Sequence, residues 1–308
     1  MSTRWWKVPL VALLALLIVS QVLTDRLPAL QVLWWIPRVL LAAPLVAGFA
    51  VLLACAMRWR WGAVEVKRLR VWLGISVAAA LICVASDWGL PRVRPDGGFR
   101  LAHWNACYPE RQDARHAVDT ILGFDADAVV ITDPGLTFVD DGIERLRAAG
   151  YGVLRAGSFA IVARVPVLEA LPKFDSRERH LTQFALDTKF GRLWIHAVDM
   201  PSSPTLPRYP LVRSLVAETA ALAIEPADII VGDFNITRGS ASLKLLTGDA
   251  REAFATAGTG WGGTYPRRFP LWGIDLMHVR APWVALRSEI VDPGFGRHRA
   301  QIVDLTKG

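Results

Sequence analysis

Hydrophobic and polar positions divide the 308-residue chain into two parts with different patterns. Up to about residue 90, uncharged runs rich in Leu, Val and Ala alternate with short charged loops. Runs of roughly 17–20 apolar residues are long enough to cross a bilayer as helices. The pattern predicts three transmembrane helices, at about 7–25, 39–57 and 71–88. A cleaved signal peptide is the alternative for the first run, but no clear small-x-small cleavage site follows it.

The second part alternates short apolar runs, which predict strands, with amphipathic segments, which predict helices. The expected strands are 99–105, 126–131, 152–156, 159–163, 181–187, 192–198, the run from Ile229, 272–279, 283–287 and 300–305, and the expected helices are 110–122, 140–149, 210–223 and 240–246. Hairpins beside crossover helices favour an α/β domain with two mixed or antiparallel sheets. The sequence therefore predicts a membrane region over 1–90, a Pro/Gly-rich linker over 91–98 and one α/β domain over 99–308.

Charge separates the same two parts. Residues 1–98 contain 11 Lys and Arg against 4 Asp and Glu, which accounts for the whole net charge of +7. Basic residues cluster at the N-terminus and between the second and third runs, and such loops stay in the cytoplasm. Three crossings then place the C-terminal domain on the outer side of a bacterial inner membrane, in the periplasm. Trp residues near the expected helix ends suit an interfacial aromatic belt.

The C-terminal domain is formally neutral, which argues weakly against a long nucleic acid as its main substrate, because binding a long nucleic acid needs many cationic side chains. A local basic patch stays compatible with this balance. Cys107 is the single cysteine of this domain, and the chain has no CxxC or zinc-type spacing.

The most informative polar stretch is Gly232-Asp233-Phe234-Asn235, which directly follows a β-branched apolar run. In an extended segment Asp233 and Asn235 point the same way, while Phe234 points to the opposite face. A carboxylate and a carboxamide at a strand end suit proton transfer and contact with phosphate oxygens. The alternative is a plain turn, because these residue types dominate turns.

Other expected strands also carry polar groups at their ends. These are Asn105, Asp133, Asp199 and Asp275, and His298 precedes the last strand. A carboxamide, several carboxylates and one histidine at strand ends suit a site that binds a hard cation beside a phosphate.

This ordered set resembles the endonuclease/exonuclease/phosphatase superfamily, which includes DNase I-like nucleases, sphingomyelinases and inositol-phosphate phosphatases. The resemblance covers about residues 99–308. It rests on Gly232-Asp233-Phe234-Asn235, Gly263-Thr264-Tyr265-Pro266, Ile274-Asp275, the stretch from Ser158 to Pro166, and His298. It implies a four-layer α/β sandwich, with two mixed sheets flanked by helices. The three predicted spans look like those of membrane-anchored bacterial members.

The resemblance also implies roles. Asn105 would lie beside the metal, Mg²⁺ or Mn²⁺, and beside the phosphate, and Asp133 would take the place of the metal-binding Glu. Asp233 would be the general acid or base, and Asn235 would hold phosphate. Elsewhere in the site, Asp275 would orient His298, and this histidine would contact the scissile phosphate or help activate water.

Three positions depart from the superfamily pattern. Asp133 is one methylene shorter than Glu, and Asp199 stands where His is usual. Arg297 replaces the Asp that usually precedes the late His, and its guanidinium suits bidentate phosphate binding. These changes agree either with an altered metal site or with a lost one.

The sequence thus predicts a membrane-anchored, metal-dependent phosphoesterase. Its partners are a lipid bilayer and a phosphorylated substrate, either a lipid, a small molecule or a nucleic acid, and no obligate protein partner is expected. A catalytically silent phosphate- or ligand-binding domain and a tethered nuclease are the alternatives. Membrane tethering and a neutral domain favour lipid-linked or small phosphorylated substrates. We expect His103, His116, His180, His196 and His278 to be surface or structural residues.

Overall fold

The computed structural model describes residues 7–175, 179–222 and 224–308. The chain forms two compact units, one ending at Asp87 and one running from Trp88 to Gly308 apart from Pro207–Tyr209. The expected helix end at residue 223 lies outside the described residues.

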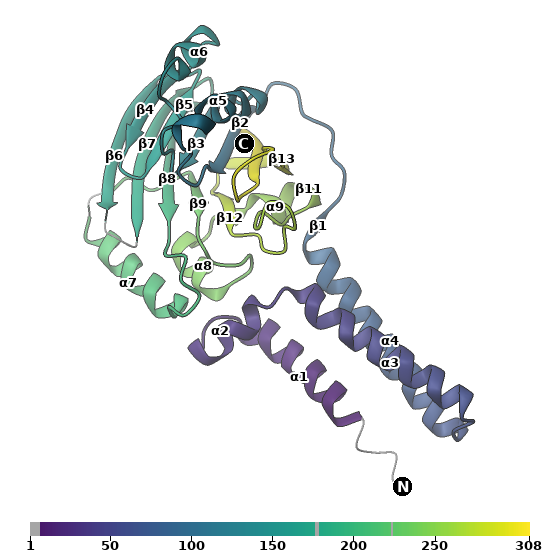
Figure 1. The fold of residues 1–308 in the computed structure, drawn as a ribbon. Coiled ribbons are helices and arrows are strands. Elements are labelled where there is room, and N and C mark those ends of the chain that lie inside the picture. Colours follow the sequence, from purple (N-terminus) through teal and green to yellow (C-terminus); the bar gives the residue numbers. More distant parts are fainter. Residues whose placement is uncertain (1–6, 176–178, 223) are drawn as a thin grey trace. The chain divides into compact units, whose positions relative to one another are not determined.

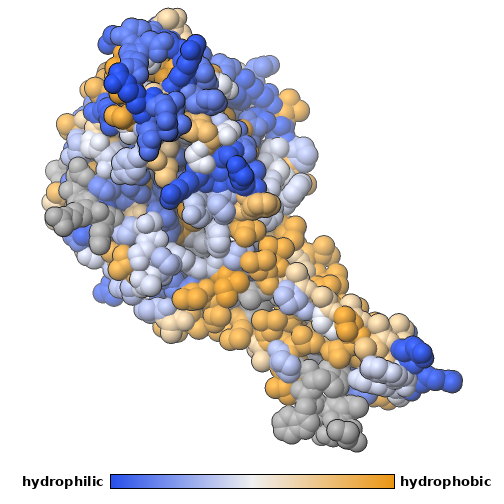
Figure 2. All heavy atoms as spheres, viewed as in Figure 1, coloured by the Kyte–Doolittle hydropathy of each residue, from blue (hydrophilic) through white to orange (hydrophobic). Residues whose placement is uncertain are grey.

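The N-terminal unit is helical. Its helices are α1 (Lys7–Leu23), α2 (Pro28–Trp35), α3 (Arg38–Arg58) and α4 (Ala63–Ser86). Helices α3 and α4 lie side by side, and both carry many exposed hydrophobic side chains (Figures 1 and 2). By length and hydropathy, α3 and α4 can each cross a membrane. Helices α1 and α2 meet at 111°, so they add a third span only if the bent pair counts as one.

Two differences from the expected spans have simple causes. The last helix begins at Ala63 rather than near residue 71, because its first turns contain charged residues that favour a helix but lower the hydropathy. Helix α2 was not expected, because its eight residues are too few for a span. It forms because the proline at its first position favours the start of a helix.

The C-terminal unit contains a larger and a smaller mixed β-sheet. The strands of the larger sheet, in spatial order, are β1 (Trp88–Gly89), β11 (Gly258–Trp261), β13 (Trp283–Val291), β14 (Ala300–Lys307), β2 (Phe99–Asn105), β3 (Ala128–Thr132), β5 (Phe159–Ala163) and β4 (Gly152–Ala156). The strands of the smaller sheet are β10 (Arg251–Glu252), β12 (Asp275–Val279), β9 (Ile229–Asp233), β8 (Gly191–Asp199), β7 (His180–Thr188) and β6 (Val167–Asp175). Strand β2 is parallel to β3, and β8 is parallel to β9.

Helices cover the outer faces of the two sheets (Figure 1). They are α5 (Ala114–Gly123), preceded by a 3-10 turn at Arg111–Asp113, α6 (Gly142–Ala148), α7 (Arg208–Ala220) and α8 (Ala241–Thr247). The short α9 (Ala253–Ala257) instead contacts β12 and β13 and adds Ala253 to the core between the sheets. Helices α5 and α6 pack on the larger sheet, and α7 and α8 pack on the smaller one. A third apolar cluster, including Leu101, Ile161, Phe184 and Val231, fills the space between the sheets. The two mixed sheets flanked by helices confirm the expected α/β architecture.

Candidate active site at the shared edge of the sheets

Register places the predicted polar residues at one edge of the molecule. In the smaller sheet, Asp275 pairs with Asp233, and Asp233 pairs with Asp199. In the larger sheet, Asn105 pairs with Thr132, and Asp133 follows directly. Parallel strands end at the same edge, so each sheet brings its polar side chains together there.

The stretch from Gly232 to Asn235 shows why the sequence folds this way locally. Gly232 has φ 153°, and a Cβ there would lie 1.8 Å from the carbonyl oxygen of Val198 on β8. Phe234 is fully buried under the smaller sheet, which anchors the chain as it leaves β9. Asn235 does not continue the extended strand as expected, because it has φ 47° in the left-handed region. It donates its backbone N–H to Asp233 at 2.9 Å and its side-chain Nδ2–H to the Met200 carbonyl at 2.8 Å.

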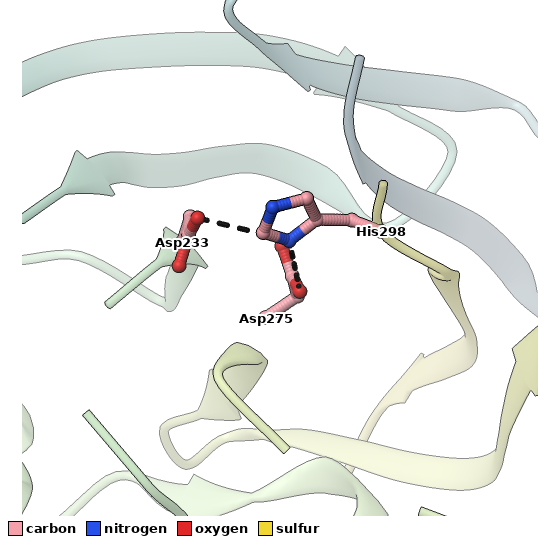
Figure 3. Close-up of side chains that lie close together, drawn as sticks. All are labelled: Asp233, Asp275 and His298. Atoms are coloured by element: carbon pink, nitrogen blue, oxygen red, sulfur yellow. Dashed lines mark hydrogen bonds and ion pairs between the residues drawn. The ribbon is translucent and has the colours of Figure 1, made fainter. Parts of the chain in front are cut away.

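Asp233, Asp275 and His298 form the buried centre of the site (Figure 3). The Nδ1 atom of His298 lies 2.9 Å from Asp275 Oδ2 and 3.8 Å from Asp233 Oδ2. Asn105 donates its Nδ2–H to Asp233 Oδ2 at 2.9 Å, so a side chain from the larger sheet holds a carboxylate of the smaller one. The Thr264 hydroxyl accepts the backbone N–H of Asp275 at 3.1 Å.

Burial and charge push the protonation states of these groups apart. Burial, with the neighbouring Asp275 charge, raises the pKa of Asp233 to about 7. Burial also favours neutral Asp275, but the charge and hydrogen bond of His298 outweigh it and lower the pKa of Asp275. Burial alone lowers the pKa of His298, but the surrounding aspartates outweigh it and raise the pKa to about 9. The centre therefore combines an Asp275–His298 ion pair with an Asp233 carboxyl that exchanges its proton near neutral pH.

The centre opens into a cleft of about 500 Å³. The predicted residues Asn105, Asp133, Asp199, Asp233, Asn235, Arg297 and His298 all line it. Asp275 is fully buried and does not line the cleft. The structure thus brings the eight predicted residues together. Seven of them line the cleft, and Asp275 lies behind His298.

Sequence reasoning missed other residues of the cleft. Tyr108, His180 and Tyr265 line it, although His180 was expected to be a surface or structural residue. The Tyr108 hydroxyl bonds to Asp133, and the Tyr265 ring lies against His298 with centroids 4.9 Å apart. Tyr108 reaches the cleft through the left-handed backbone of Cys107 and Tyr108, for which the sequence carries no periodic signal. The Gly-Thr-Tyr-Pro motif was the available signal for Tyr265.

Two further carboxylates make the cleft suitable for a cation. Burial raises the pKa of Asp133, and burial with the Asp233 charge raises the pKa of Asp199 to about 9. The Asp133 Oδ1 atom is buried without a hydrogen-bond partner among the described residues. Such a site of carboxylate and carboxamide oxygens fits Mg²⁺ or Mn²⁺, whose positive charge would relieve the repulsion.

The candidate metal ligands differ in how far hydrogen bonds to the protein already occupy them. Asn105 accepts the Cys107 N–H through Oδ1 at 2.8 Å and donates to Asp233, so it is first of all a holder of Asp233. Its carbonyl oxygen keeps a second lone pair for a cation. Asp233, Asp275 and His298 also offer ligand atoms within 4.8 Å of one another, a grouping that the sequence did not predict for metal. Because Mg²⁺ prefers oxygen ligands, the Asp133 side of the cleft suits it better.

Several solved structures share the fold of the C-terminal unit. An endonuclease/exonuclease/phosphatase family protein from Bacteroides thetaiotaomicron matches with a TM-score of 0.52 and 16% identity over 68% of this chain and 98% of that chain. The mannosyl-6-phosphatase of the same organism matches with a TM-score of 0.52 and 16% identity over 68% and 99%. D. rerio TDP2, complexed with a single-strand DNA product, matches with a TM-score of 0.51 and 15% identity over 69% and 100%.

No protein family matches this chain at the sequence level, and no curated protein does. At 11–19% identity the solved structures establish the fold alone. The C-terminal unit has the endonuclease/exonuclease/phosphatase fold, as the sequence resemblance implied.

Proposed function

We propose that the C-terminal unit is a divalent-metal-dependent phosphoesterase that hydrolyses a phosphodiester or a phosphomonoester. The observation that carries this proposal is the buried Asp233–His298–Asp275 centre, which opens into a cleft lined by further carboxylates and Arg297. The fold shared with a mannosyl-6-phosphatase and with TDP2 supports the same reaction class.

In this proposal His298 and Asp233 move or hold the protons. Asp275 holds Nδ1 of His298, which leaves Nε2 to face a phosphate in the cleft. With its raised pKa the imidazolium donates a hydrogen bond to a phosphate oxygen, where negative charge develops in the transition state. Asp233 has a pKa near 7, which suits a general base that takes a proton from the attacking water.

The other residues of the cleft bind and orient the phosphate. The exposed Arg297 guanidinium offers two parallel N–H donors to phosphate oxygens. Asn235 lies beside Asp233 on the cleft wall and adds a carboxamide. When bound by Asp133 and the Asn105 carbonyl oxygen, a divalent cation would neutralise phosphate charge and stabilise the leaving oxygen.

We further propose that the N-terminal helices anchor this unit to a bacterial inner membrane, with the active site outside the cytoplasm. The apolar surfaces of α3 and α4 and the basic loop between them, which includes Arg58 and Arg60, support this proposal. Residues 99–308 are formally neutral. A membrane-tethered unit of this charge suits lipid-linked or small phosphorylated substrates better than long nucleic acids.

A substrate panel tests the proposed activity. Full-length protein in detergent micelles is assayed with Mg²⁺ on a chromogenic diester, a chromogenic monoester, mannose 6-phosphate, single- and double-stranded DNA and phospholipid vesicles. We expect hydrolysis of at least one ester class, and His298→Ala to lower its rate by about 100-fold or more, because an acid–base group is lost. His116→Ala, on the exposed face of α5, is the matched control.

Two outcomes contradict the proposal in different ways. Unchanged hydrolysis in His298→Ala would place the active site elsewhere. Binding of phosphate or metal without hydrolysis of any substrate would favour a catalytically silent binding domain.

A further inference from the structure

His103 is a buried titratable residue that the proposed chemistry does not use. Its side chain is fully buried, and it lies on β2 two residues before Asn105. Alternation along the strand puts both residues on the face toward the smaller sheet, where Phe99 and Leu101 belong to the core between the sheets. His103 therefore lies next to Asn105 on the same face of β2, directly behind the site in the interior of the domain.

The two ring nitrogens of His103 have different surroundings. Nε2 lies 3.0 Å from the Thr132 hydroxyl, whereas Nδ1 has no hydrogen-bond partner among the described residues. A neutral imidazole carries one proton, either on Nδ1 or on Nε2. When the Thr132 hydroxyl donates to Nε2, that proton is on Nδ1.

Asp275 presents the complementary group. Its Oδ2 atom bonds to His298, and the Thr264 hydroxyl also acts on this carboxylate. The Oδ1 atom is buried and makes no well-formed hydrogen bond to the described residues. Strand β2 contacts β12 across the core, and the Asp275 charge acts on His103. The buried Nδ1 atom of His103 thus lacks a partner among the described residues, while Asp275 Oδ1, on the same side of its sheet, keeps a lone pair for a further donor. Buried polar groups in native proteins nearly always find a partner, directly or through an ordered water.

We propose that His103 is a positioning residue of the active site, which holds the Asp275 carboxylate through its Nδ1–H, directly or through one bridging water. This inference rests on the proposed function. The result is one chain of side-chain hydrogen bonds in which each group fixes the orientation of the next. It runs from Thr132 through His103 and Asp275 to His298. Outer partners of this kind orient a catalytic imidazole without touching the substrate.

Two substitutions separate this role from packing. In His103→Asn the side-chain N–H₂ occupies the place of Nδ1 and keeps a donor toward Asp275. In His103→Gln the N–H₂ reaches the place of Nε2, which keeps the Thr132 contact but loses the donor to Asp275. The control is His278→Gln, because His278 is equally buried and its Nδ1 also has no partner among the described residues.

The test measures kcat, KM and the low-field Nδ1–H proton signal of His298 in full-length, histidine-labelled protein in micelles. We expect His103→Gln to lower kcat by about ten- to a hundred-fold with KM unchanged, and to broaden or shift the signal. We expect His103→Asn and His278→Gln to stay near the wild type in kcat and in the signal.

Equal losses in the Asn and Gln variants would overturn the inference, as would an unchanged His298 signal in His103→Gln. A wild-type protein that hydrolyses nothing would instead contradict the proposed function, and the proton signal would still decide the role of His103.

Discussion

At the scale of single residues, the site depends on two aspartates that pair across neighbouring strands yet differ in protonation. Asp275 is bonded to His298 and stays ionised, whereas Asp233 has a pKa near 7 because burial and the Asp275 charge disfavour a second negative charge. Environments that separate two carboxyl groups in this way assign one to hold an imidazole and the other to exchange a proton.

A neutral buried histidine makes the stability of the C-terminal unit depend on pH. Burial lowers the pKa of His278 to about 3, from about 6.5 in the unfolded chain. Between these values the unfolded state binds the extra proton, so this contribution is complete above about pH 6.5 and is lost as the pH falls. When the pH is lowered from 7 to 5, we expect the free energy of unfolding to fall by about 2 kcal/mol less in His278→Gln than in the wild type. Denaturant unfolding of full-length protein in micelles at both pH values measures this, and identical losses would contradict it.

The residues that the sequence could predict were those fixed by strand ends. Asn105, Asp199 and Asp233 each end a strand, so the apolar run before them indicates their place at the edge of a sheet. Tyr108 and His180 carry no such signal. Tyr108 needs two left-handed residues to turn into the cleft, and His180 begins a strand whose start the apolar pattern placed one residue later.

At the scale of elements, the close approach of β8 and β9 holds Asp199 and Asp233 together. Gly232 makes it possible, because a Cβ there would overlap the Val198 carbonyl.

Strand β6 is an element that the local hydrophobic pattern could not predict. It was not predicted, because Pro172 interrupts its alternation, and Pro is tolerated there since β6 is an edge strand with a register shift beside it. Strands β2, β4 and β5 have the predicted bounds, and β5 is the clearest of them because its run Phe159–Ala163 is unbroken by polar residues.

Gly232→Ala tests this element directly. We expect it to destabilise the C-terminal unit by about 3 kcal/mol, since the new methyl group forces β8 and β9 apart. The control is Gly152→Ala on the edge strand β4, where a Cβ meets only the Ala163 carbonyl oxygen at 3.7 Å. Unfolding midpoints of the two variants measure the difference, and equal midpoints would contradict the role of the close approach.

At the scale of the whole molecule, the apolar helices and the α/β fold belong to separate units. The entire net charge of +7 lies in residues 1–98, where it indicates orientation in a membrane rather than affinity for nucleic acid. Length and hydropathy allow two or three crossings. The proposed topology, with the N-terminus in the cytoplasm and the C-terminal unit outside it, requires an odd number.

Reporter fusions after Gly308 test this orientation. We expect a periplasmic alkaline phosphatase fusion to be active and a fluorescent protein that folds only in the cytoplasm to stay dark. The protein should remain in the membrane fraction after an alkaline carbonate wash, because burial of two or three apolar helices is effectively irreversible. The opposite reporter pattern would contradict the predicted topology.

In the proposed function, Asp233 and His298 are the centre of a metal-dependent phosphoesterase. The most direct measurement is the hydrolysis rate of the best panel substrate by full-length protein, stripped with EDTA and titrated with Mg²⁺ or Mn²⁺. We predict no turnover in EDTA and recovery with the metal, a higher half-saturating metal concentration in Asp133→Asn, and a loss of about 10²–10⁴-fold at every concentration in Asp233→Asn. Asp187→Asn, at the exposed position near the end of β7, should match the wild type. Turnover that persists in EDTA, or that is the same in Asp233→Asn and the wild type, would contradict the account.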